Sequence, residues 1–256
     1  MREYADEKII RQYLSGAAKD IKIETVMLID STNDEMKRRA AKGEMEIALL
    51  IAEEQTNGRG TKGRSFFSPE GTGIYMSFLL RPTYTPQDCT LLTTMAAVST
   101  AKAIKKVTGL APQIKWVNDI YLHKKKAGGI LTQAHLSMDG KEVEWAVVGI
   151  GVNLSEPAGG FPTELTEIAT TLGNESGQIK NRLIAEIANE LICCYRNLLQ
   201  KEFIAEYSAR LLGLHEEMTV QLGESQITGE VIGINEQCHL LLRLSDGSIR
   251  TLTSAL

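Results

Sequence analysis

Apolar and polar residues follow two different patterns along this chain, and the pattern changes near residue 213. Before that point, short apolar runs typical of buried strands alternate with longer stretches in which apolar residues recur every three or four positions. The apolar run at 47–52 and the alternating segment at 74–80 predict two strands. Apolar residues recur every three or four positions over 86–108, which predicts the longest helix. Gly109 should end it, because glycine is a typical residue at a helix end.

The rest of the chain repeats these patterns more briefly. Helical spacing is present at 2–15, 30–41 and 178–212, and further strands are predicted at 23–29, 114–122, 126–131 and 147–153. After residue 213, four short alternating strands are predicted at 218–222, 226–234, 239–244 and 248–253. We therefore predict two domains, residues 1–212 and residues 213–256, the second being a small barrel that is hardly stable alone.

A glycine-rich basic loop joins the strands at 47–52 and 74–80. It contains the glycines Gly58, Gly60, Gly63, Gly71 and Gly73 and the cations Arg59, Lys62 and Arg64. Glycine allows backbone N–H groups to approach a ligand closely and to form a nest for an anion. Arginine adds bidentate donors for phosphate or carboxylate. The composition of the loop favours equally a lid over an anionic substrate and a solvated, mobile connection.

Two short segments of this loop resemble nucleotide-binding and RNA-binding motifs but do not match them fully. Residues 58–65 come close to the nucleotide-binding G-x-x-x-x-G-K-S loop, but Arg64 replaces its lysine. The residues that follow, 66–71, predict a turn where that motif needs a helix. The tripeptide Gly-Arg-Gly at 58–60 is found in RNA-binding segments, but a single unrepeated copy is weak evidence for RNA binding.

Composition restricts the class of protein. At 256 residues, the chain has room for one large domain, or for a large and a small one. The net charge of −4 gives no general attraction to nucleic acid or to anionic membranes, so any anion must be bound by a local patch. No apolar run reaches the roughly 18 residues of a membrane span, and the N-terminus lacks the apolar core of a signal peptide.

The four cysteines show neither metal spacing nor a dense disulfide framework, so we expect a reducing, cytoplasmic location. Cys193 and Cys194 are adjacent in an apolar helical stretch, and we expect both to be buried thiols.

The motifs, taken in order, resemble those of the biotin–protein ligases. The signature loop of that family, GRGRxGRxWxSPxGxGxYxSxxLRP, matches at Gly58, Arg59, Gly60, Gly63, Arg64, Ser68, Pro69, Gly71, Gly73, Tyr75, Ser77, Leu80, Arg81 and Pro82. The triplet S-T-N at 31–33 precedes this loop, and three more family motifs follow it: K-W-P-N-D-[IL] at 115–120, K-x-x-G-I-L at 126–131 and G-[IA]-G-[VI]-N at 149–153. The resemblance covers nearly the whole chain.

The resemblance implies an α/β (α+β) fold. Its larger part would be a class II aminoacyl-tRNA-synthetase-like catalytic domain, with a mixed, mostly antiparallel sheet flanked by helices. Its C-terminal part would be an SH3-like small β-barrel. The implied enzyme is a biotin–[acetyl-CoA-carboxylase] ligase, which uses ATP to convert biotin to biotinyl-5′-AMP and transfers it to a lysine of a biotin carboxyl carrier protein. ATP, biotin and Mg²⁺ are the implied substrates and cofactors.

The resemblance also implies roles for individual residues. The biotin-binding residues would be Ser31, Thr32, Asn33, Gln55, Gly58, Arg59, Gly60, Thr61, Lys126 and Gly129. ATP or the adenylate would be contacted by Arg64, Lys115, Trp116, Asn118 and Asn153, and Asp119 would bind the metal. Lys126, Arg59 and Lys115 would be catalytic, as cations that neutralise carboxylate and phosphate. The amide of Gln55 would face the ureido ring of biotin, since an amide offers both a donor and an acceptor.

Simpler explanations exist for several of these residues. Ser31, Thr32 and Asn33 are preferred helix N-caps, and Asn118-Asp119 between two apolar runs is an ordinary hairpin turn. The sequence also departs from the family pattern where Thr61 replaces arginine, Phe66 tryptophan, Val117 proline and Cys238 glycine. A lipoate–protein ligase, a non-enzymatic vitamin-binding module and an RNA-binding protein are the alternative functions.

The expected partner is the carrier domain of a biotin-dependent carboxylase. We expect no membrane association and, by analogy with relatives, a possible homodimer. We also expect no specific DNA binding, because the roughly twenty residues before the first strand are too few for the three-helix DNA-reading domain of some relatives.

Overall fold

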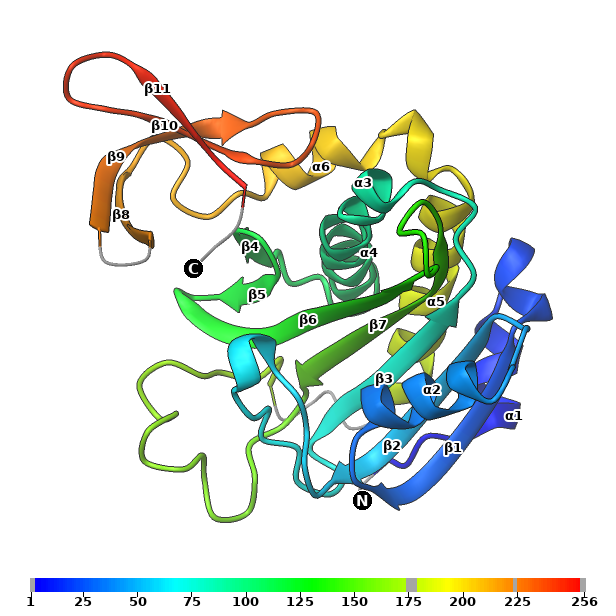
Figure 1. Ribbon diagram of the computed structural model, residues 1–256. Helices are drawn as coiled ribbons and strands as arrows, with labels where there is room; N and C mark the ends of the chain where they lie inside the picture. Colours follow the sequence, from blue (N-terminus) through cyan, green and yellow to red (C-terminus); the bar gives the residue numbers. More distant parts are fainter. Residues whose placement is uncertain (1–2, 174–178, 223–224, 254–256) are drawn as a thin grey trace.

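A seven-stranded mixed sheet forms the centre of the molecule (Figure 1). The computed structural model describes residues 3–173, 179–222 and 225–253. The strands of the large sheet are β1 (Lys22–Ile29), β2 (Ala48–Gln55), β3 (Gly73–Leu80), β4 (Gln113–Lys115), β5 (Asp119–Leu122), β6 (Lys125–Leu136) and β7 (Val143–Asn153). Their order is β1-β2-β3-β7-β6-β5-β4. Only β1 and β2 run parallel, so the predicted mixed, mostly antiparallel sheet is confirmed.

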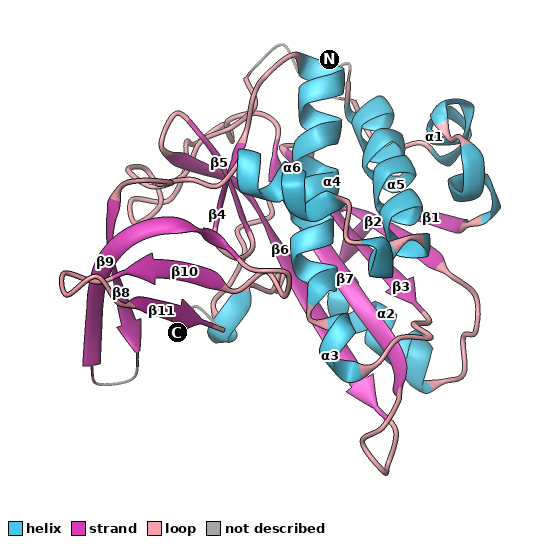
Figure 2. Cartoon of the chain, turned by 90° about the horizontal axis from the view of Figure 1, so that it is seen from above, coloured by secondary structure: helices cyan, strands magenta, loops and turns pink. Residues whose placement is uncertain are grey.

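Helices cover both faces of this sheet (Figures 1 and 2). They are α1 (Glu7–Tyr13), α2 (Thr32–Ala41), α3 (Pro86–Cys89), α4 (Leu91–Thr108), α5 (Lys180–Arg196) and α6 (Phe203–Ala209). Helices α4 and α5 pack together on one face over the main hydrophobic core. Helix α2 covers the other face, where Met36 packs with Leu50, Leu79 and Val147 in a smaller core.

Strand β3 shows why a buried strand cannot be recognised by polarity alone. Every one of its residues is buried, including Ser77, because α2 lies over one face and the main core over the other. Coverage of both faces removes the alternation of polar and apolar residues that a half-exposed strand would show.

Helix α2 begins at a cap that the sequence predicts. The Ser31 hydroxyl accepts a hydrogen bond from the N–H of Asp34, at 3.4 Å. Acidic residues occupy its first turn and Arg38 and Arg39 its last turn, which matches the helix dipole. The first residues of α2 lie over the face of the large sheet, where Asn33 contacts Ser77 of β3 and Leu131 of β6.

A smaller antiparallel sheet follows at the C-terminus. Its strands are β8 (Glu217–Leu222), β9 (Ser225–Ile234), β10 (Leu240–Arg243) and β11 (Ile249–Leu252), in the order β11-β10-β9-β8. All four predicted strands are therefore present. The chain reaches this sheet along β4, since the N–H of Ile114 donates to the carbonyl of Arg210 and the N–H of Leu212 donates to that of Ile114.

The helical predictions need two corrections. The stretch 86–108 is two helices, α3 and α4, and the helical region predicted at 178–212 contains α5, a short 3-10 turn (Leu198–Gln200) and α6. Cys193 is exposed, whereas Cys194 is half-buried. The expectation of two buried thiols was wrong for Cys193, which lies on the exposed side of α5, directly after the buried residues Leu191 and Ile192.

No helix in the described ranges has both the length and the apolar character needed to cross a membrane.

Candidate active site

A cleft opens beside the corner between β1 and α2, over the ends of β6 and β7. It is lined by Ser31, Thr32, Asn33, Gln55, Arg59, Gly60, Thr61, Phe66, Met76, Asn118, Lys126, Gly129, Ile130, Leu131, Gly149, Ile150 and Gly151. Residues from five motifs, far apart in the sequence, therefore meet in one concave site. Such a site, with a few polar groups among apolar ones, is typical of small-molecule binding.

Two glycines of β7 make room for the cleft wall. A Cβ atom on Gly149 would lie 1.9 Å from Oδ1 of Asn33, and one on Gly151 would lie 2.6 Å from the ring of Phe66. Side chains at these positions would push α2 and the basic loop away from the sheet. The glycines are therefore required for close packing around the cleft.

One end of the cleft is neutral and polar. The N–H of Thr32 donates to Oε1 of Gln55 at 2.9 Å, and the hydroxyl oxygen of Thr32 lies 3.1 Å from the same Oε1. Nε2 of Gln55 donates to the hydroxyl of Ser68 at 2.9 Å, and Nδ2 of Asn33 donates to the carbonyl of Leu131 at 3.3 Å. These contacts fix the orientation of both amides and present uncharged donors and acceptors to the cleft.

The basic loop folds back on itself above the cleft. Gly60 donates its N–H to the carbonyl of Arg64 at 2.7 Å, and Phe66 donates to the carbonyl of Gly58 at 2.9 Å. A Cβ atom on Gly58 would lie 2.4 Å from the Phe66 carbonyl oxygen, so this position needs glycine. The loop thus has a hairpin shape above the cleft.

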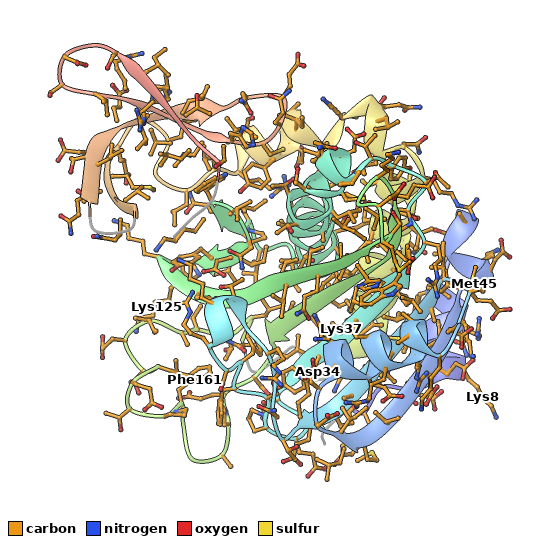
Figure 3. The ribbon with its side chains drawn as sticks, viewed as in Figure 1. Lys8, Asp34, Lys37, Met45, Lys125 and Phe161 are labelled. Atoms are coloured by element: carbon orange, nitrogen blue, oxygen red, sulfur yellow. The ribbon has the colours of Figure 1, made fainter. Side chains whose placement is uncertain are left out.

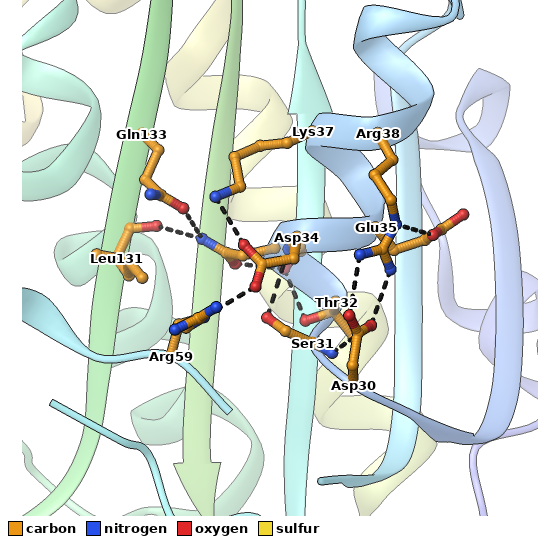
Figure 4. Close-up of polar contacts among 12 residues, drawn as sticks. Asp30, Ser31, Thr32, Asp34, Glu35, Lys37, Arg38, Arg59, Leu131 and Gln133 are labelled. Atoms are coloured by element: carbon orange, nitrogen blue, oxygen red, sulfur yellow. Dashed lines mark hydrogen bonds and ion pairs between the residues drawn. The ribbon is translucent and has the colours of Figure 1, made fainter. Parts of the chain in front are cut away.

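Arg59 is anchored to the first turn of α2 (Figure 4). Its Nε donates to Oδ2 of Asp34 at 2.8 Å, and Nζ of Lys37 lies 2.6 Å from Oδ1 of the same carboxylate. Burial opposes ionisation of Asp34, but the hydrogen bonds from Lys37 and Arg59 outweigh it and lower the pKa of Asp34. Figure 3 shows Asp34 and Lys37 on α2, in front of the large sheet. One edge of the cleft therefore carries a fixed guanidinium.

Lys126 supplies a second cation at the start of β6. Its Nζ lies 2.6 Å from Oδ1 of Asp119, and its side chain is 33% exposed. Its backbone is held by the segment 168–170, because Lys126 donates to the carbonyl of Ile168 and accepts from the N–H of Thr170, both at 2.8 Å. Lys126 is thus a fixed, partly accessible ammonium group in the cleft.

Asn118 closes the cleft next to Lys126. Its Nδ2 donates to the backbone carbonyl of Ile130 at 2.9 Å, and the backbone carbonyl of Asn118 accepts from the N–H of Ile130. The turn 116–119 is therefore tied to β6 beside Lys126.

Six of the predicted site residues do not line the cleft: Gly58, Arg64, Lys115, Trp116, Asp119 and Asn153. Arg64 donates to the hydroxyl and carbonyl of Thr61, and the ammonium of Lys115 lies 5.5 Å from the ring centre of Tyr121.

Trp116 and Asn153 make contacts that differ from the predicted contact with a nucleotide. The Trp116 indole N–H donates to the carbonyl of Cys238 at 2.8 Å, and the Trp116 side chain is buried. The amide of Asn153 donates to the carbonyl of Thr170 at 3.0 Å. Trp116 therefore joins the two sheets, and Asn153 holds the loop that pairs with Lys126.

Several residues that line the cleft were not predicted from the sequence: Phe66, Met76, Ile130, Leu131, Gly149, Ile150 and Gly151. Gly149, Ile150 and Gly151 belong to the same motif as Asn153, so the motif was the available signal. Ile130 and Leu131 likewise belong to the K-x-x-G-I-L motif, and Phe66 and Met76 lie within the signature loop. Their contact with the cleft was missed because apolar residues look like any other buried residue.

The described residues contain no group of three or more His, Cys, Asp or Glu side chains that could hold a metal ion. Mg²⁺ is commonly bound by one or two carboxylates together with substrate phosphates. The carboxylate of Asp119 fits that limited role, since its Oδ1 makes no hydrogen bond within the described structure besides its ion pair with Lys126.

Two family models match the chain. The biotin/lipoate A/B protein ligase family matches residues 26–153, and the biotin protein ligase C-terminal domain matches residues 214–255.

Curated relatives and solved structures agree with these matches. The chain is 33% identical over 227 residues to the bifunctional ligase/repressor BirA of Bacillus spizizenii, covering 86% of this chain and 69% of the relative. It is 28% identical over 255 residues to the biotin–[acetyl-CoA-carboxylase] ligase of Mycobacterium tuberculosis, covering 94% and 91%. The biotin protein ligase of Aquifex aeolicus in complex with biotin and ATP superposes with a TM-score of 0.75 at 29% identity, covering 91% of this chain and 96% of that one.

Proposed function

The chain belongs to the biotin/lipoate A/B protein ligase family, and we propose that it converts biotin and ATP to biotinyl-5′-AMP and transfers the biotinyl group to a lysine of a biotin carboxyl carrier protein. The relatives named as biotin–[acetyl-CoA-carboxylase] ligases establish the class of enzyme. The choice of carrier protein as acceptor is our proposal.

One observation supports this function best. A single cleft holds a neutral polar end at Thr32, Asn33 and Gln55 and a cationic edge at Arg59 and Lys126. Biotin has a matching polarity, since its ureido ring is neutral with donors and acceptors and its valeryl chain ends in a carboxylate. We infer that the ring binds at the polar end and that the carboxylate points towards the cations.

The first proposed step is adenylate formation. A carboxylate oxygen of biotin attacks the α-phosphorus of ATP, a new P–O bond forms, and the bond to the β-phosphate oxygen breaks to release pyrophosphate. Two anions must approach each other, so the main catalytic task is charge neutralisation and positioning. Lys126 and Arg59 would perform it within the cleft, and Lys115 and Arg64 would contact the phosphates from its edge.

The second proposed step transfers the biotinyl group. The unprotonated amine of the carrier lysine attacks the acyl carbon of the mixed anhydride, an amide bond forms, and the C–O bond to phosphate breaks to release AMP. The amine gives its proton to solvent. Lys126 would stabilise the negative charge that develops on the carbonyl oxygen. No side chain of this enzyme becomes covalently modified.

Asp119, together with the amide oxygen of Asn118, would hold Mg²⁺ in the presence of ATP. The ion would neutralise phosphate charge during adenylate formation.

The proposed carrier-binding surface is the outer edge of β6. Strand β5 pairs with β6 only up to Gly129, so residues 131–136 pair on one side only, with β7, in the described part of the chain. Leu136 is 43% exposed, and Met138 at the tip of the following hairpin is fully exposed. An exposed edge with apolar residues can accept a strand of another protein. The edge begins at the cleft, because Leu131 is also a cleft residue.

The remaining expectations stay predictions. We infer a class II synthetase-like core, an SH3-like C-terminal domain beginning at residue 213 and a cytoplasmic location, which the four free cysteines favour. A homodimer through an exposed sheet edge is a further prediction. With a net charge of −4, specific DNA binding is not expected, and a footprint on an operator at physiological salt would contradict this.

Pyrophosphate release tests the proposed function. The purified protein should release pyrophosphate only when ATP and biotin are both present, and adding a carrier domain should yield biotinylated lysine. Lipoate in place of biotin should give no release, which separates this function from a lipoate ligase. Biotin binding without pyrophosphate release would indicate a vitamin-binding module, and RNA binding without either would indicate the third alternative.

A further inference from the structure

A completely buried serine connects the polar residues at the neutral end of the cleft. Ser77 lies on β3, its side chain is 0% exposed, and it does not itself line the cleft. Its Oγ is 2.6 Å from Oδ1 of Asn33 and 2.8 Å from Oγ1 of Thr32. Both partners do line the cleft, so Ser77 supports them from behind.

The hydrogen-bond directions around Ser77 follow from counting protons. A hydroxyl donates one hydrogen bond, and the amide oxygen of Asn33 can only accept. Nδ2 of Asn33 already faces two acceptors, the carbonyl of Leu131 and Oε1 of Gln133, so its Oδ1 must face Ser77. The Ser77 proton is therefore directed to Asn33, at the shortest distance in the network, and Ser77 Oγ is left as an acceptor.

The Thr32 proton then has two possible acceptors. One is Ser77 Oγ at 2.8 Å, and the other is Gln55 Oε1 at 3.1 Å. Donation to Ser77 leaves Gln55 Oε1 with a single hydrogen bond, from the N–H of Thr32 at 2.9 Å. Donation to Gln55 would instead occupy both lone pairs of that oxygen.

The orientation of Gln55 is itself fixed. The Ser68 hydroxyl donates to the carbonyl of Phe66 at 2.8 Å, so it accepts from Nε2 of Gln55. The Gln55 amide cannot turn over without losing this bond and placing its N–H groups against the N–H of Thr32. Among the hydrogen bonds that join Thr32, Asn33, Gln55 and Ser77, the adjustable element is thus the Thr32 proton.

We propose that Ser77 is a positioning residue which draws the Thr32 proton away from Gln55 and so keeps one lone pair of Gln55 Oε1 free for a ring N–H of the ligand. The matching ligand class is a cyclic urea, which presents N–H donors beside a carbonyl acceptor. This inference rests on the proposed function for the identity of the ligand. It adds that recognition of the ring is set by a residue that does not touch it.

Ser77→Ala tests this role. With Ser77 Oγ removed, the Thr32 proton has only Gln55 Oε1 as acceptor, and the ligand N–H loses its partner. We expect the Kd for biotin, measured by calorimetry without ATP, to rise about ten- to a hundredfold. The KM for ATP should stay near the wild-type value, whereas a general loss of packing would affect both substrates.

A double variant separates proton direction from simple support. Thr32→Val keeps the shape of the side chain but carries no hydroxyl proton, so Gln55 Oε1 is free again in Thr32→Val/Ser77→Ala. We expect the double variant to bind biotin more tightly than Ser77→Ala alone. Binding that is as weak as in Ser77→Ala, or weaker, would overturn the proposal, as would a wild-type Kd for Ser77→Ala.

Ser99→Ala is the matched control. Ser99 is also 0% exposed, but its hydroxyl donates to the carbonyl of Met95 within α4, away from the cleft. Ser99→Ala should lower the melting temperature without changing the Kd for biotin. Should Ser77→Ala not fold, Ser77→Cys, with a weakly accepting sulfur, should give an intermediate rise in Kd, and a wild-type Kd would overturn the proposal. Failure of wild-type protein to bind biotin at all would instead refute the proposed function.

Discussion

At the scale of single residues, Lys126 is the group on which the proposed chemistry depends most. Lys126→Ala should reduce the rate of biotin-dependent pyrophosphate release by about 10²–10³-fold, as for loss of one preorganised donor to a developing charge. The fold should survive, because the ammonium is partly exposed and, among the described residues, it forms an ion pair with Asp119 alone.

The neighbouring lysine provides the control. Lys125 carries the same charge, but its Nζ donates to the carbonyl of Thr166 at 3.1 Å in the long loop. Lys125→Ala should therefore retain near wild-type release. A folded Lys126→Ala protein with the activity of Lys125→Ala would exclude Lys126 from the reaction.

We expect Thr61 to affect how tightly the adenylate is held. Its hydroxyl accepts a hydrogen bond from Nη2 of Arg64 at 3.2 Å and offers the ligand no charge, whereas the related enzymes' pattern has arginine here. Thr61→Arg adds a guanidinium worth about 1.5–3 kcal/mol, so it should slow biotinyl-adenylate release about ten- to a hundredfold. Stopped-flow measurement of the two off-rates checks this. Equal rates would show that residue 61 does not contact the adenylate.

A buried ion pair, between Lys180 and Glu53, lies outside the cleft. Lys180 and Glu53 are 1% and 2% exposed and contact each other directly, and burial lowers the pKa of Lys180. Lys180→Met leaves the Glu53 carboxylate buried without its partner and should cost about 3–5 kcal/mol of unfolding free energy. Glu53→Gln/Lys180→Met removes both charges, so urea denaturation should find it more stable than Lys180→Met alone. The opposite order would mean that the charge of Glu53 is not the cause.

Sequence motifs identified the residues whose chemistry is unusual, such as Lys126 and Gln55. They did not identify partners distant in sequence. Nothing local links Glu53 to Lys180, and nothing in the signature loop reveals that Ser77 lies behind Thr32. Such pairs depend on how strands and helices meet, which only the folded chain defines.

At the scale of elements, α2 is stabilised by charge pairs whose strength depends on pH. A hydrogen bond from Arg38 lowers the pKa of Asp30 to about 2, and one from Arg39 lowers the pKa of Glu35. Because these carboxyl pKa values are lower in the folded state, the stabilisation is complete above the ordinary pKa of 3.8 for Asp30 and is lost as the pH falls towards 2.

Arg38→Gln should therefore lower the unfolding free energy by less than about 1 kcal/mol near neutral pH, since these side chains are half exposed. The difference from wild type should shrink at about pH 3. Lys8→Gln removes the same charge from a residue that points into solvent (Figure 3) and should show no such pH dependence. A constant difference for Arg38→Gln between the two pH values would contradict the assignment.

Most elements were predictable because local patterns agreed with the final packing. Short-range rules predicted the N-cap at Ser31, the end of α4 at Gly109 and the four C-terminal strands. The break at Thr90 and the end of α5 at Arg196 were missed because apolar spacing continues across both turns. The spacing of apolar residues indicates which face of a helix is buried, but it does not show where one helix ends and the next begins.

At the scale of the whole molecule, the smaller sheet is attached to the turn that carries Asn118 and Asp119. The Trp116 indole donates to the Cys238 carbonyl at 2.8 Å, and the Tyr207 hydroxyl donates to the Val117 carbonyl at 3.2 Å. Both contacts hold the backbone immediately before the proposed nucleotide-binding residues. The C-terminal part of the chain therefore helps to position that turn.

Trp116→Phe tests this coupling, because it keeps an aromatic ring and removes only the N–H donor. The buried Cys238 carbonyl loses its partner, which should cost about 1 kcal/mol or more and raise the KM for ATP about fivefold, with the KM for biotin unchanged. Trp145→Phe is the control, since Trp145 lies on β7 and stacks on His135 of β6, outside the turn that carries Asn118 and Asp119. In a Trp145→Phe background, Trp116 is the remaining tryptophan, and its fluorescence should change on adding ATP. An equal rise in both KM values, or no rise in either, would show that the smaller sheet does not position the nucleotide turn through Trp116.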